Sequence, residues 1–164
     1  MKNLIITLPW QLWWAIEHGH KMYECRKTLP KLAQKGSKVY VVEKGTTKVR
    51  GYFYIDSFIS TNNYYRAWRE FGRKLFIEEE WFNNYTRNHY GSIHFWKIAG
   101  VCKFERDIDL NLYFGITHNP QSFVYTDLEP KIPHTIAQLL DPEKNKMVTP
   151  YYSEYSGIPN DMPF

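Results

Sequence analysis

One short segment of the chain concentrates charged residues at spacings that suit a binding site. It runs from Gly19 to Lys27 and reads Gly-His-Lys-Met-Tyr-Glu-Cys-Arg-Lys. Its second half alternates as a strand does, which puts Glu24 and Arg26 on one face. A carboxylate held by an arginine stays ionised, and the arginine keeps further donors for a ligand. With Lys21 as a point charge beside them, the segment predicts a pocket for a phosphate and a hydrogen-bonding base. A surface salt bridge worth about 0–1 kcal/mol is the simpler alternative.

The charge of the whole chain is unevenly distributed. Residues 1–74 carry 14 Lys and Arg against 5 Asp and Glu, whereas residues 75–164 carry 7 against 12. A basic half of this kind is typical of proteins whose partner carries many phosphates. A lysine-rich surface that only keeps the protein soluble is the alternative.

Other standard sites are not indicated by the sequence. It contains neither G-x-x-x-x-G-K-[ST] nor G-x-G-x-x-G, so no phosphate loop of those kinds is expected. His18 and His20 lack an obvious third ligand nearby, and we expect them to be surface residues rather than a zinc site. The two cysteines are too few for a disulfide framework, and strand parity predicts that Cys25 is a core thiol. We therefore expect no metal and no cofactor.

The 164 residues, of which 43% are hydrophobic, correspond to about one domain with its own core. No apolar run is long enough to span a membrane, and the first residues lack the features of a signal peptide. We therefore expect a cytoplasmic protein that does not act at a membrane. The aromatic share of 18% argues against a disordered chain.

Hydrophobic periodicity predicts an α+β fold with a small mixed β-barrel, because the strands and helices do not alternate as in a βαβ sheet. Arg66, Arg69 and Arg73 are expected on the exposed face of one helix. Ile77, Trp81 and Tyr85 are expected to form the inner stripe of the next. Six of the nine prolines lie in residues 130–164, which we interpret as an extended segment that wraps the domain. The predicted strands are 3–8, 22–27, 39–42, 49–59, 92–104 and 122–125, and the predicted helices are 9–18, 62–75, 78–88 and a short one at 136–140.

The chain resembles the ASCH domain, a branch of the PUA-like superfamily. The family opens with an apolar strand that ends near a proline, followed by a helix and a G-x-K-x-x-E-x-R segment. Many members close with a P-Q-S-F-x-Y segment, and the likeness covers about residues 3–126. The matching positions are Leu4 to Pro9, the helix from Trp10, Gly19, Lys21, Glu24 and Arg26, the strands at 38–42 and 51–59, and residues 94–98 and 120–125.

This resemblance implies a small PUA-like mixed β-barrel flanked by helices. The ASCH-like domain would span residues 1–130, and residues 131–164 would form a Pro- and Tyr-rich C-terminal extension that packs on it. The resemblance also implies RNA or other nucleic-acid binding in a cleft lined by the signature residues. We predict that the cleft holds a nucleotide or single-stranded RNA, with Trp10 or Tyr40 stacking on a base and Glu24 accepting from a base amino group. The remaining candidate contacts are Lys21, Arg26, Gln121 and Ser122 in the cleft, and Lys27, Lys31, Lys35 and Lys38 to phosphates, with the exposed arginines extending the track.

An enzyme is the other class of function that the resemblance leaves open. Some related bacterial proteins are acetylcytidine amidohydrolases, which match this chain at Gly19, Lys21 and Arg26. They use as nucleophile a threonine at the position where this chain has Glu24. A ribonuclease activity is also associated with the family. In either case Lys21 and Glu24 are the candidate catalytic residues. The aromatic residues and the proline-rich tail suit a homodimer interface as a further alternative.

Overall fold

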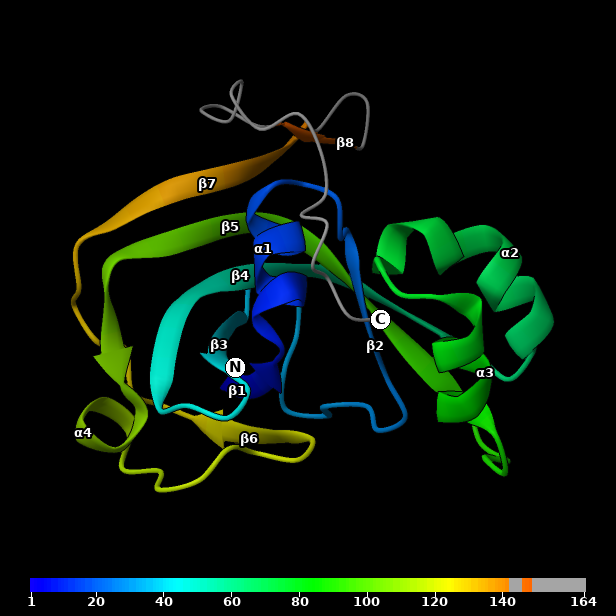
Figure 1. Ribbon diagram of the computed structural model, residues 1–164, viewed down its shortest axis with the longest axis horizontal. Coiled ribbons are helices and arrows are strands. Elements are labelled where there is room, and N and C mark those ends of the chain that lie inside the picture. Colours follow the sequence, from blue (N-terminus) through cyan, green and yellow to red (C-terminus); the bar gives the residue numbers. More distant parts are fainter. Residues whose placement is uncertain (142–145, 149–164) are drawn as a thin grey trace.

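The structure, a computed structural model, describes residues 1–141 and 146–148. A strongly curved mixed sheet forms most of the molecule, and a pair of helices lies beside one end of it (Figure 1). The strands are β1 (Asn3–Leu8), β2 (Tyr23–Arg26), β3 (Lys38–Glu43), β4 (Lys48–Thr61), β5 (Ile93–Asp109), β6 (Phe123–Thr126), β7 (His134–Asp141) and β8 (Lys146–Val148). The helices are α1 (Trp10–Glu17), α2 (Tyr64–Leu75), α3 (Glu79–Thr86) and α4 (Leu110–Phe114).

The sheet curls into a half-barrel because its two longest strands bend. The strand order is β6-β1-β3-β4-β5-β7-β8, and β2 also pairs with β5. β1 runs parallel to β3, and the other pairs are antiparallel. The register between β4 and β5 shifts at three places, and such bulges bend strands. At one of them a Cβ on Gly51 would lie 2.2 Å from the carbonyl oxygen of Cys102, so only glycine permits this close approach.

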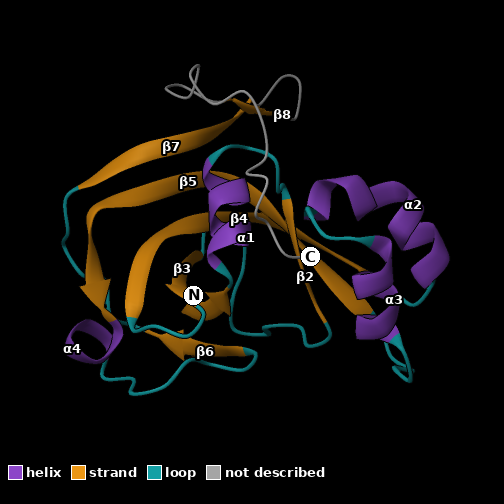
Figure 2. Cartoon of the chain, viewed as in Figure 1, coloured by secondary structure: helices purple, strands orange, loops and turns teal. Residues whose placement is uncertain are grey.

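Helix α1 packs against the concave side of the sheet (Figure 2). Its Trp13 and Ile16 are buried in one apolar core with Leu4, Val41 and Phe53, which come from three different strands. Pro9 precedes the helix at its N-cap, as the sequence predicts, because proline needs no donor there. The helix thereby closes one side of the half-barrel.

Helices α2 and α3 cover the ends of β2 and β5 with a separate core. Phe71 and Leu75 of α2 meet Phe82 of α3 and Phe95 of β5 in this core. The predicted exposure of Arg66, Arg69 and Arg73 is confirmed. The predicted inner stripe of α3 is confirmed for Ile77 and Tyr85, which are partly buried and pack against this core. It is wrong for Trp81, which is 46% exposed, because Phe82 is the buried aromatic residue of this helix.

Two elements near the C-terminal side differ from the sequence prediction. Residues 136–140, predicted as a short helix, belong to strand β7, which pairs with the edge of β5. Pairing with an available sheet edge outweighs the helical preference of Leu and Ala here. Helix α4 was not predicted, although the Asp109 side chain accepts from the backbone N–H of Leu112 and Gly115 ends the helix in a left-handed conformation. The rest of the proline-rich tail, 142–145 and 149–164, lies outside the described residues.

Within the described part of the chain, no helix combines the length and the apolar character that a bilayer span requires.

Candidate functional site

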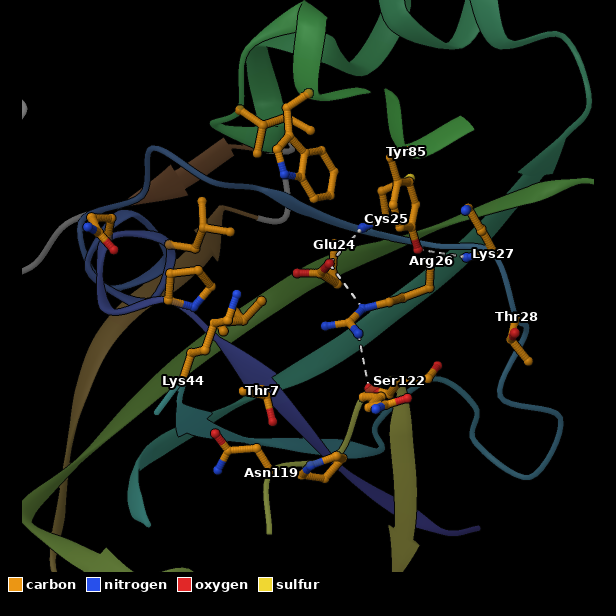
Figure 3. Close-up of a pocket in the computed structure, with 18 residues that line it drawn as sticks. Thr7, Glu24, Cys25, Arg26, Lys27, Thr28, Lys44, Tyr85, Asn119 and Ser122 are labelled. Carbon is orange, nitrogen blue, oxygen red and sulfur yellow. Dashed lines mark hydrogen bonds and ion pairs between the residues drawn. The ribbon is translucent and has the colours of Figure 1, made fainter. Parts of the chain in front are cut away.

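A cavity of about 670 Å³ lies between the start of α1, the strand β2, the helix α3 and the segment before β6 (Figure 3). It therefore lies where the two sequence segments that carry the family resemblance approach each other. Four groups of residues line it: Thr7, Leu8, Pro9, Gln11 and Leu12; Glu24, Cys25, Arg26, Lys27 and Thr28; Lys44, Ile77, Trp81 and Tyr85; and Asn119, Pro120, Gln121 and Ser122.

Glu24 lies in the wall of this cavity and is buried. Its Oε1 accepts from the backbone N–H of Cys25 and from Nε of Arg26, both at 3.2 Å. Its Oε2 lies 3.5 Å from Nζ of Lys21 but receives no hydrogen bond from the described residues. One carboxylate oxygen is therefore fixed by two hydrogen bonds, and the other is held by the longer ion pair with Lys21.

Lys21 forms an ion pair with Glu24 and does not line the cavity itself. Its ammonium group is buried and donates to the carbonyl oxygen of Leu75 at 2.9 Å, at the end of α2. Burial lowers the pKa of Lys21, and the nearby Glu24 carboxylate partly opposes this change. Lys21 therefore positions Glu24 and ties β2 to α2.

Arg26 connects the two segments of the family resemblance. Its Nε donates to Glu24, and its Nη1 donates to the carbonyl oxygen of Ser122 at 3.0 Å (Figure 3). Because a guanidinium has five N–H donors, further donors remain for a ligand. Arg26 therefore places an acceptor and a donor side by side in the cavity wall.

An aromatic pair from α3 lines the same cavity. The rings of Trp81 and Tyr85 stack with centroids 4.9 Å apart at an angle of 16°. The ammonium group of Lys27 lies 4.5 Å from the centre of the Tyr85 ring, and its backbone N–H donates to the Tyr85 hydroxyl. Trp81 thus offers an exposed ring at a cavity whose wall also contains charged, polar and apolar side chains.

Cys25 is buried as predicted, although it contributes to the cavity wall. Burial raises the pKa of its thiol to about 12. At neutral pH this cysteine is therefore a small apolar group rather than a nucleophile.

The structure brings together most, but not all, of the predicted site residues. Glu24, Arg26, Lys27, Gln121 and Ser122 line the cavity. The prediction that Tyr40 stacks on a base is wrong, because its ring is 1% exposed and packs against Tyr52 and Phe114 in the core. Trp10 is 39% exposed at the start of α1 and does not line the cavity.

The other predicted phosphate contacts lie outside this cavity. Lys35 pairs with Asp56, and Lys38 pairs with Glu129. Lys31 is exposed on the loop between β2 and β3. These lysines therefore do not contribute directly to the cavity wall.

Sequence reasoning missed Lys44, Asn119 and Thr7 as lining residues, and it assigned Trp81 and Tyr85 to a core stripe. Lys44 and Asn119 lie in turns that no local pattern connects to the signature. The sequence did not distinguish the exposed Trp81 from the buried Phe82, because the direction in which α3 packs against α2 decides which of the two faces the core.

The expectation that His18 and His20 are surface residues is wrong for His18, which is buried, and confirmed for His20, which is exposed. Both histidines near the end of α1 belong to an aromatic stack. His18 and His20 both lie parallel to the Trp14 ring, with centroids 4.3 Å and 5.4 Å away. The part of the chain that the structure describes contains no group of three or more His, Cys, Asp and Glu side chains placed to hold a metal ion.

Comparisons with known proteins identify the fold. No family model and no curated protein matches the sequence. Among solved structures, the ASCH protein of Zymomonas mobilis matches with a TM-score of 0.67 and 20% identity, over 76% of this chain and 87% of that one. Two single-site mutants of that protein match at TM-scores of 0.68 and 0.67, with 20% and 19% identity, over 77% and 76% of this chain and 91% and 88% of theirs. The chain therefore has the fold of these ASCH structures, an α+β half-barrel, as the resemblance of its two segments implies.

Proposed function

We propose that this protein binds a nucleotide or single-stranded RNA, with one base held in the cavity between β2 and α3. The observation that carries the proposal is the buried Glu24–Arg26 pair in a cavity whose rim includes an exposed tryptophan. A base has polar edges, which can form hydrogen bonds with Glu24 and Arg26, and flat faces, one of which can stack on Trp81.

The polar edge of a base complements the cavity wall. Among the described residues, Glu24 Oε2 is buried and held only by its ion pair with Lys21 at 3.5 Å, so it keeps acceptor capacity for a donor of a ligand. An exocyclic amino group would donate to this oxygen, and a neighbouring ring nitrogen or carbonyl would accept from Arg26. The pair therefore favours a base that presents a donor next to an acceptor.

The flat face of a base complements Trp81. Stacking on an aromatic side chain contributes about 1–3 kcal/mol per base, and it tolerates different bases. The Trp81 ring is supported by Tyr85, so little ordering is needed when a base arrives.

Two tryptophans provide a matched test. Trp81 and Trp10 have similar exposure, but only Trp81 lines the cavity. We expect Trp81→Ala to weaken binding of a fluorescently labelled single-stranded RNA by about 5- to 150-fold, and Trp10→Ala to leave it unchanged. Equal effects of the two substitutions would contradict the placement of the base.

Hydrolysis of a modified nucleoside or of RNA is the alternative use of the same cavity. A buried lysine with a lowered pKa beside a carboxylate is a feature of many catalytic sites. Against this, Glu24 is fixed by Lys21 and Arg26, an arrangement that suits a stationary acceptor better than a group that transfers protons. Wild-type protein and Glu24→Gln should be compared for turnover of acetylcytidine and of RNA, and only loss of turnover in the variant would support catalysis by Glu24.

A further inference from the structure

Lys44 approaches the cavity from a turn that is held in place by a side chain from the opposite segment. The turn joins β3 to β4, and its Gly45 has a φ of +81°, which favours glycine. Asn119 accepts from the backbone N–H of Gly45 at 2.9 Å and donates to the carbonyl oxygen of Thr46 at 2.7 Å. The backbone N–H of Lys44 itself donates to the carbonyl oxygen of Leu8. The base of the Lys44 side chain is therefore fixed at the cavity rim.

Lys27 is fixed on the other side of the cavity by Tyr85. The hydroxyl of Tyr85 accepts from the backbone N–H of Lys27 at 3.2 Å, while the lysine ammonium lies over the same ring. Neither Lys27 nor Lys44 forms an ion pair with a carboxylate within the described residues. Both charges therefore remain available to a ligand.

The two lysines lie on opposite sides of the cavity, with Glu24 and Arg26 between them (Figure 3). The lining residues include three cations, Arg26, Lys27 and Lys44, and one carboxylate, Glu24. Because Glu24 is already paired with Arg26 and Lys21, the two rim lysines dominate the field at the cavity mouth.

We propose that the cavity takes a nucleotide from within a single strand, and that Lys27 and Lys44 each bind one of the two phosphates that flank it. This inference rests on the proposed function, since it requires a base between Glu24 and Trp81. A free nucleoside uses neither lysine, and a mononucleotide uses only one of them. A strand that enters on the Lys44 side and leaves on the Lys27 side uses both, which explains why fixed cations occupy both rims.

The salt dependence of binding tests the proposal. Each phosphate that a protein neutralises contributes about 0.7 to the slope of log affinity against log salt concentration for a single strand. The probe is a labelled single-stranded RNA of twelve nucleotides, titrated at four salt concentrations. Lys27→Met and Lys44→Met remove the charge and keep the aliphatic stem, so that packing on Tyr85 is retained. Lys131→Met, an exposed lysine outside the cavity, is the control.

We expect each rim substitution to reduce the slope by about 0.7 and the double substitution to reduce it by about 1.4, with the control unchanged. A parallel titration with adenosine and cytidine should show the same affinity in wild type and in the double variant. An unchanged slope for either Lys27→Met or Lys44→Met would overturn the proposal, even if RNA still binds in a Trp81-dependent way. No binding of RNA or of nucleosides by the wild type would instead overturn the proposed function itself.

Discussion

The side chain of Arg26 donates a hydrogen bond from Nη1 to the carbonyl oxygen of Ser122 at 3.0 Å, across 96 positions of the chain. Arg26 ends β2, whose partner strand within residues 1–141 and 146–148 is β5, and Ser122 directly precedes β6, whose partner strand there is β1. No ladder of backbone hydrogen bonds joins β2 to β6 in the described residues. The Arg26 side chain therefore bridges the side on which the half-barrel is open, and the cavity lies beside this bridge.

The bridge predicts a stability cost when Arg26 is replaced. Arg26→Met keeps much of the stem but removes the bonds to Ser122 and Glu24. Hydrogen bonds of charged groups contribute about 1.5–3 kcal/mol each, so we expect the loss of both bonds to lower the free energy of unfolding by roughly 3–6 kcal/mol. Urea unfolding followed by tryptophan fluorescence measures the change. Arg66→Met, on the exposed face of α2, is the control and should change stability by less than about 0.5 kcal/mol.

Local patterns predicted six of the strands from two different signals. Continuous apolar runs indicated β1 and β3, which are buried on both faces, and alternation indicated β2. The alternation around Tyr23 and Cys25 correctly predicted that both side chains enter the core. The same alternation placed Glu24 and Arg26 on one face, and this face lines the cavity. The side of the strand that carries the site was therefore present in the sequence.

Assembly of the cavity from distant segments was not predictable in the same way. Tyr40 lies on a strand rich in β-branched residues. The position of Tyr40 in the alternation does not show whether its side chain faces a cavity or a second core. The curl of β4 and β5 places it in the second core. Trp81 depends on the direction in which α3 packs, which Phe82 determines through contacts with Trp68 of α2. Long-range packing of this kind leaves no periodic signal.

The buried Lys21–Glu24 pair predicts a non-additive effect on stability. Glu24→Gln leaves the Lys21 ammonium buried without its carboxylate, and breaking a buried ion pair in this way costs about 3–5 kcal/mol. The double variant Lys21→Met/Glu24→Gln removes the buried charge as well. We expect it to be more stable than Glu24→Gln alone in urea unfolding. Additive losses from the two substitutions would show that the two groups do not interact.

The same pair predicts how the stability difference depends on pH. The pKa of Lys21 is lowered in the folded state by burial and is partly restored by Glu24, so Glu24→Gln lowers it further. Between the folded and unfolded pKa values the unfolded chain binds more protons, and stability therefore rises with pH. The deficit of Glu24→Gln relative to the double variant should shrink as pH rises from 7 towards 10. Unfolding at five pH values checks this, and a constant deficit would contradict it.

The buried thiol of Cys25 predicts slow chemical modification. With a pKa of about 12, roughly one molecule in ten thousand carries the thiolate at pH 8, and the side chain is 6% exposed. Cys102 is buried as well, and burial raises its pKa too. We expect neither thiol to react with an aromatic disulfide reagent within minutes at pH 8, and both to react in urea. Rapid labelling of Cys25, identified by mass spectrometry against a Cys25→Ala variant, would show that the cavity opens more than the structure indicates.

The hydrogen bonds of Asn119 allow its effect on the turn to be measured separately from its effect on ligand binding. Its side chain bonds to Gly45 and Thr46, whereas its own contact with a ligand is not required for the proposed role. Asn119→Ala should therefore increase the hydrogen-exchange rate of the Gly45 amide. Because Lys44 is then less well fixed, RNA affinity should also fall. The salt slope should change by less than the roughly 0.7 expected for the loss of one phosphate contact. Asn119→Asp keeps the acceptor for Gly45, so the amide should stay protected while the bond to Thr46 is lost. Equal exchange rates in wild type and Asn119→Ala would show that the turn is held by its own backbone. Reduced affinity in the presence of such equal rates would mean that Asn119 contacts the ligand directly.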